Sequence, residues 1–205
     1  MTILVIMMIL IIVKYKKIEK VNLFFFVGYL LLSVSDFFFY FYYKLTNLPT
    51  EKYYSICLAI VFLMYLLYYY KLIYLPLLKK IQLVLLVLFF VNIFAVSFIE
   101  KSFFENLSFN IFYINILLLI FSIILFLYQT FNSDKIFEIK NYLPFWLSVG
   151  SLIFYTGIIP LFFFRVKVSE DLFAIIVFLL NLINNIVIAF GLFWNKPDKA
   201  KQVGL

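Results

Sequence analysis

Residues 21–43 read VNLFFFVGYLLLSVSDFFFYFYY, an apolar run in which Asp36 is the single charged residue. A helix needs about 20 mostly apolar residues to cross the hydrocarbon core of a bilayer, so this run predicts a membrane span. Similar runs follow, and the predicted spans cover residues 21–43, 54–75, 81–99, 109–131, 145–165 and 172–194. The sequence therefore predicts an all-α fold, a polytopic transmembrane helix bundle.

A shorter apolar run at residues 1–13 would reach only about 20 Å as a helix. It lacks the basic start and the small-residue cleavage site of a signal peptide. We expect a short first span whose flanking lysines extend toward the headgroups, which gives seven spans; an interfacial helix and six spans are the alternative. Since the connecting segments are short, we expect residues 1–205 to form a single transmembrane domain without a soluble domain.

The composition favours the same class. Hydrophobic residues make up 67% of the chain, charged residues 13%, and the mean hydropathy is +1.13, whereas about a quarter of the residues in a soluble domain are charged. We interpret the net charge of +7 as lysines at span ends facing anionic lipid. We expect the lipid bilayer and a membrane or signalling protein as partners, and no nucleic acid; an oligomer is left open.

The basic residues also predict an orientation. With seven spans and the N-terminus outside, twelve basic residues fall inside and five outside, which favours an N-out, C-in topology. The inside set is Lys14, Lys16, Lys17, Lys20, Lys71, Lys79, Lys80, Lys135, Lys140, Lys196, Lys199 and Lys201, and the outside set is Lys44, Lys52, Lys101, Arg165 and Lys167. The excess of lysine over arginine, with many Phe, Ile, Asn and Tyr residues, indicates an AT-rich bacterial genome, so we expect the bacterial cytoplasmic membrane.

Catalytic chemistry has few candidates. The chain has no histidine, the commonest general base, and Cys57 is its only cysteine. A disulfide within the chain and a zinc site of the usual cysteine type are therefore excluded. We expect no catalytic residues, no metal, no cofactor and no enzymatic activity.

Asp36 is the first candidate site residue, because a carboxylate inside a span costs about 3 kcal/mol of insertion free energy. It should face the bundle and either pair with a polar group or stay protonated. Ser33 lies three residues before it, on the same helical face. A ligand or proton site is one hypothesis, and a structural carboxyl bonded to neighbouring helices is the other.

Asparagines in the later spans extend this candidate polar site. Asn181, Asn184 and Asn185 share one face of the last span, and Asn92 and Asn115 lie in the fourth and fifth spans. Amides in lipid commonly join helices at about 0.6 kcal/mol per bond. The functional alternative is a polar pocket that these asparagines form with Asp36.

Small residues and a proline mark the sixth span. Gly150 and Gly157 are seven residues apart and share a face, which favours close helix packing. Pro160 removes a hydrogen bond inside the span, so a kink is expected there, with a hinge at 157–160 as the functional alternative.

The segment PFWLSVGSLIFYTGIIP, residues 144–160, and the asparagine-rich last span carry a resemblance. Residues 141–194 resemble uncharacterised seven-helix integral membrane proteins of AT-rich Bacteroidota. The short first span departs from that pattern, and the group has no assigned activity, so the likeness implies topology only. The segment LLLSVSDFFFY, residues 30–40, is similar to membrane lysoplasmalogenase-like proteins, although the rest of their pattern is missing.

Three functional classes remain from the sequence. A sensory or accessory membrane component that acts through a partner protein is favoured. A small-molecule or ion transporter or channel is the alternative, because of Asp36, the asparagines and Pro160. An intramembrane lipid hydrolase ranks last, since no nucleophile and base pair can be assembled.

Overall fold

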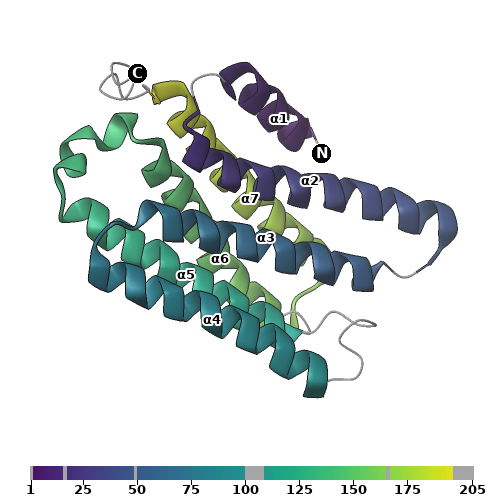
Figure 1. Cartoon of the computed structure of the whole chain (residues 1–205). Helices are drawn as coiled ribbons and strands as arrows, with labels where there is room; N and C mark the ends of the chain where they lie inside the picture. The colour runs from purple at the N-terminus through teal and green to yellow at the C-terminus, as the bar shows by residue number, and fades with distance from the viewer. Residues whose placement is uncertain (1, 16–17, 49, 100–108, 165–166, 196–205) are drawn as a thin grey trace. The chain divides into compact units, whose positions relative to one another are not determined.

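The computed structural model describes residues 2–15, 18–48, 50–99, 109–164 and 167–195, and all the regular elements in these ranges are helical. This confirms the all-α prediction. In chain order the elements are α1 (Thr2–Lys14), α2 (Lys20–Thr46), α3 (Glu51–Leu72), α4 (Pro76–Ile99), α5 (Phe109–Phe131), the 3-10 helix η2 (Asp134–Asn141), α6 (Leu143–Phe163) and α7 (Glu170–Trp194) (Figure 1).

Six of these helices, α2 to α7, are long and apolar enough to cross a membrane. The protein is therefore a multi-pass membrane protein. The first apolar run is helical too, but its apolar part, Val5–Lys14, is shorter than a usual span. Seven spans thus stay a prediction, while six described helices have the length and composition of a span.

The α3–α4 junction differs from the predicted boundaries. The predicted spans 54–75 and 81–99 placed Pro76 in the connection, whereas α3 ends at Leu72 and Pro76 is the first residue of α4. Proline suits the first position of a helix because its missing N–H would have no partner there. It also disfavours a helical conformation at Leu75, which separates the two helices.

The helices form two units, which we describe separately. The first unit contains residues Phe24–Gln129, where α3, α4 and α5 run alongside one another (Figure 1). Its core is rich in aromatic rings that are almost completely buried. Phe25 stacks on Tyr65 with ring centroids 4.9 Å apart, and Tyr69 meets Phe126 at 5.8 Å. These contacts join α2 and α5 to α3.

A buried glutamine closes the α3–α4 turn of this unit. Gln129 of α5 accepts hydrogen bonds from the backbone nitrogens of Tyr74 and Leu75, at 2.8 and 3.0 Å. Its amide nitrogen donates to the carbonyl of Leu72 at 3.2 Å. One side chain thereby satisfies three backbone groups at helix ends that have no partner within their own helices.

The second unit contains Thr2–Leu23 and Thr130–Leu205. Its centre is the hairpin of α6 and α7, and α1 packs on α7. Gly191 of α7 permits the approach to α6: a Cβ placed there would lie 2.6 Å from the Cβ of Trp146. The missing side chain at Gly191 therefore sets the distance between the helices at this point.

The end of this unit near η2 carries lysines over aromatic rings. The Nζ of Lys140 lies 4.9 Å from the Trp194 ring, and the Nζ of Lys14 lies 5.4 Å from the Phe193 ring. No residue of η2 is buried, and Phe137 is 89% exposed. Paired ammonium groups and aromatic rings are typical of the headgroup level of a bilayer.

Candidate functional site

Asp36 lies on α2 opposite the start of α3. The hydroxyl of Tyr54 on α3 donates a hydrogen bond to its carboxylate, and Asp36 forms no ion pair with a described residue. The side chain is exposed, so the prediction that it turns into the bundle is wrong as to burial. The predicted polar contact exists, but its partner is Tyr54 rather than Ser33 or an asparagine.

Ser33 does not reach Asp36, because its hydroxyl is already used within α2. Its Oγ donates to the backbone carbonyl of Tyr29, one turn earlier, at 2.8 Å. Serines inside helices often bond back in this way. Ser33 is buried, and its hydrogen bond lies within its own helix.

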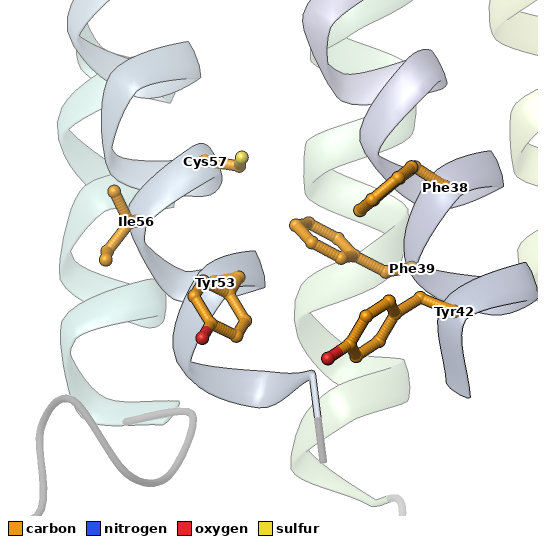
Figure 2. A pocket seen from close by; sticks show the side chains of 6 residues that line it. All are labelled: Phe38, Phe39, Tyr42, Tyr53, Ile56 and Cys57. Atoms are coloured by element: carbon orange, nitrogen blue, oxygen red, sulfur yellow. The ribbon is translucent and has the colours of Figure 1, made fainter. Parts of the chain in front are cut away.

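A cavity of about 360 Å³ lies between α2 and α3, and neither Asp36 nor Tyr54 is among its lining residues. Its walls come from the C-terminal half of α2 and the first turns of α3. The lining residues are Phe38, Phe39, Tyr42, Tyr53, Ile56 and Cys57 (Figure 2). Figure 2 shows the rings of Phe39 and Tyr42 extending from α2 toward α3, where the side chain of Cys57 points back toward them. The volume lies in the range of ordinary small-molecule sites.

Ring contacts connect this cavity to the carboxylate. Phe39 is three residues after Asp36, so the two share a helical face about one turn apart. The Phe39 ring lies 6.3 Å from the Tyr53 ring and 6.2 Å from the Tyr54 ring. Tyr54 therefore contacts Phe39, a lining residue of the cavity, and also hydrogen-bonds to Asp36. The arrangement offers one acidic group at the edge of an aromatic surface.

Asn92 and Asn115 form a hydrogen bond with each other, which is one of the pairings that the sequence left open. Both are buried, and the Nδ2 of Asn92 donates to the Oδ1 of Asn115 at 3.0 Å and to the carbonyl of Ile111 at 3.3 Å. The pair joins α4 to α5. Its geometry matches the predicted role of asparagines as helix-to-helix bonds, and neither residue lines the α2–α3 cavity.

The three asparagines of α7 belong to the second unit. Asn181 donates to the carbonyl of Val177 at 3.0 Å, and Asn185 donates to that of Asn181 at 2.7 Å. The buried Oδ1 of Asn184 has no hydrogen-bond partner among the described residues. A pocket shared by these asparagines and Asp36 stays a prediction.

The glycines of α6 lie against α7. A Cβ at Gly150 would meet the Oδ1 of Asn184 at 2.7 Å, and one at Gly157 would meet the Cδ2 of Leu180 at 2.5 Å. Helix α6 continues through Pro160 to Phe163. The described geometry therefore assigns the two glycines to packing, and the hinge stays a prediction.

Tyr54 and the aromatic lining of the cavity were missed from the sequence. Tyr53 and Tyr54 lie near the start of a predicted span, where tyrosines are common, so their position alone does not distinguish a binding surface. The signal was available in part: Phe39, Tyr42 and Tyr53 lie on two spans joined by a short connection, which places them near one another.

The residues that the structure describes contain no candidate metal site. No group of three histidine, cysteine, aspartate or glutamate side chains in the described ranges could hold an ion.

No family model matches the chain, and searches of the curated proteins and of the solved structures found no match.

Proposed function

We propose that this protein is a sensory or accessory component of the bacterial cytoplasmic membrane that binds a small amphiphilic molecule between α2 and α3 and acts through a partner protein. The carrying observation is the aromatic cavity of about 360 Å³ between α2 and α3, whose lining residue Phe39 contacts the ring of Tyr54, the partner of Asp36. Aromatic walls suit the apolar part of a ligand, and the tyrosine hydroxyls of the same lining suit its polar part.

The cavity can be tested by filling it. Protein purified in mild detergent is expected to carry one small molecule per chain in native mass spectrometry. Cys57→Trp places a large ring in the cavity wall and should remove that molecule. Ala174→Trp adds the same ring to an exposed position of α7 and should leave it bound. A wild-type protein without adduct, or an adduct that survives Cys57→Trp, would contradict the proposal.

A transporter is the second candidate, because the carboxylate lies within a membrane-spanning helix. The two functions differ in the fate of the ligand. Once the co-purified molecule is identified, proteoliposomes should bind it without accumulating it if the protein is sensory or accessory. Accumulation that depends on an ion gradient, and that Cys57→Trp abolishes, would instead establish transport.

For topology, we propose an N-out, C-in orientation. The lysine asymmetry supports it, and described lysines extend along aromatic rings, as Lys71 does over Phe24 at 3.6 Å. A green fluorescent protein fused after Leu205 should fluoresce, and alkaline phosphatase at the same position should be inactive. An active phosphatase fusion would reverse the orientation.

A further inference from the structure

The α2–α3 cavity has a polar end and an apolar end. Tyr42 lies four residues before the end of α2 at Thr46, and Tyr53 lies in the first turn of α3. Figure 2 shows the hydroxyl oxygens of both tyrosines nearer to the α2–α3 connection than Phe38 and Cys57 are. Each of these two deeper residues is four positions from the tyrosine of its own helix, about 6 Å along the axis. Polarity therefore falls along the cavity from the span ends toward the hydrocarbon.

The two tyrosine hydroxyls have no partner within the described part of the chain. Neither the hydroxyl of Tyr42 nor that of Tyr53 forms a hydrogen bond with a described residue, and the bond from Thr46 reaches the backbone carbonyl of Tyr42 instead. An occupant that displaces water from these hydroxyls must replace the hydrogen bonds of that water. A hydroxyl or carbonyl group at the polar end of the occupant would do so.

The lining of the cavity offers no charge to its occupant. None of the six lining residues is acidic or basic. Asp36 and Tyr54 lie outside the lining. Lys44 is two residues after Tyr42 and therefore on another face of α2. A charged group placed between Tyr42 and Tyr53 would lose water without gaining a counter-charge from the lining, which is costly. The lining therefore favours an uncharged polar end.

We propose that the cavity binds one hydrocarbon chain with an uncharged hydroxyl or carbonyl group, which hydrogen-bonds to Tyr42 and Tyr53 while the chain extends toward Cys57. This inference rests on the proposed function, which places a ligand in the same cavity, and it names the ligand's chemical class. The ring pairs Phe38–Tyr42 and Phe39–Tyr53, with centroids 6.1 and 6.3 Å apart, form apolar walls for the chain. A volume of about 360 Å³ is near the lower limit for small-molecule sites, which favours one chain over two. The chain belongs either to a free amphiphile or to a bilayer phospholipid with its ester carbonyl.

The charge requirement can be tested with three photoactivatable probes that share one chain and differ in their headgroup. Hexadecanol, hexadecyl sulfate and hexadecyltrimethylammonium, each with a diazirine at the same chain carbon, are added to the full chain in phosphatidylglycerol nanodiscs. Crosslinks to Ile56 and Cys57 are divided by those to Ile175, an exposed residue of α7, to correct for the amount of probe in the bilayer. Corrected labelling by hexadecanol should exceed that by either charged probe about fivefold, the ratio that one net hydrogen bond supplies.

Removing the hydroxyls tests the same contact from the side of the protein. Tyr42→Phe combined with Tyr53→Phe keeps both rings and should lower the corrected hexadecanol labelling about fivefold, to the level of the charged probes. Tyr40→Phe, at a position 57% exposed and outside the lining, is the matched control and should leave the labelling unchanged. Tyr53→Phe alone serves if the double variant does not fold. Cys57→Trp should lower the labelling of Ile56 by every probe, because its ring occupies the cavity.

The two sources of the chain can be distinguished with ether-linked phosphatidylglycerol, which has no ester carbonyl. If the site normally holds the ester end of a bilayer lipid, hexadecanol labelling should rise when ether-linked lipid replaces ester-linked lipid in the nanodiscs. Unchanged labelling identifies a free amphiphile. Either result agrees with an uncharged hydrogen-bonding group between the two tyrosines.

Failure of this inference differs from failure of the proposed function. Equal corrected labelling by the three probes, or unchanged hexadecanol labelling in the double tyrosine variant, would overturn the uncharged class. The cavity would still be a site if Cys57→Trp then lowered the labelling of Ile56. If no probe labelled Ile56 above the level of Ile175 and the purified protein carried no adduct, the proposed function would fail together with the inference.

Discussion

Replacing Gly191 by leucine is expected to lower the melting temperature of the purified protein by about 6–12 °C. A Cβ at this position would lie 2.6 Å from the Cβ and 3.1 Å from the Cγ of Trp146, and 3.1 Å from the Cδ1 of Leu143. The Cβ of Trp146 is held by the backbone of α6 and cannot rotate away. The two helices must therefore separate, at about 3 kcal/mol, the upper part of the range for overpacked sites.

Two further variants show whether the effect comes from this contact. Gly157→Leu should destabilise less, because its obstacle is a methyl group of Leu180, which can change rotamer. Ala174→Leu adds the same side chain to an exposed position of α7 and should leave the melting temperature within about a degree. Melting can be followed with a thiol-reactive dye, because Cys57 is the only cysteine. Equal melting of Gly191→Leu and wild type would show that α6 and α7 do not pack as described.

Replacing Gln129 by leucine should cost about 3 kcal/mol, because it leaves three backbone groups without their bonds. Those groups are the nitrogens of Tyr74 and Leu75 and the carbonyl of Leu72. An unpaired buried group costs about 1–3 kcal/mol, and water near the exposed Tyr74 compensates part of that sum. The same thiol-dye assay should show a melting temperature lower by about 6–12 °C.

Gln129→Glu is the matched variant for that prediction. A glutamate keeps oxygens that accept from the nitrogens of Tyr74 and Leu75 and loses only the donor to Leu72. It should therefore retain more stability than Gln129→Leu. If both variants melted together at the wild-type temperature, the α3–α4 turn would not depend on this side chain.

The spans were predictable from the sequence because each is a local property. Twenty apolar residues define a helix in a bilayer whatever its neighbours are, and α2 to α7 lie where the apolar runs lie. Local chemistry also explains the ends: Ser169 caps α7 by accepting from the nitrogen of Leu172. The boundary at Pro76 was missed because the span window was read without the preference of proline for a first helical position.

Long-range pairs could not be predicted in the same way. Gln129 and its partners are more than 50 residues apart, and a polar residue near a span end has many possible neighbours. The same holds for Asp36: its place in an apolar helix can be read from the sequence, but its contact with Tyr54 depends on how α2 and α3 face each other. The pairing of Asn92 with Asn115 was one of several combinations that the sequence left open.

The packing of α1 on α7 has a consequence for biosynthesis. Helix α1 is synthesised long before its partner α7, whose Phe193 ring lies under the ammonium group of Lys14. Residues so far apart in the chain make contacts that form late. Until α7 is made, α1 lacks this partner, and Ile12 and Val13 are exposed near its end even in the folded chain. A nascent chain arrested before α7 should therefore expose α1 to proteases and insertion chaperones, and release of the complete chain should end that exposure.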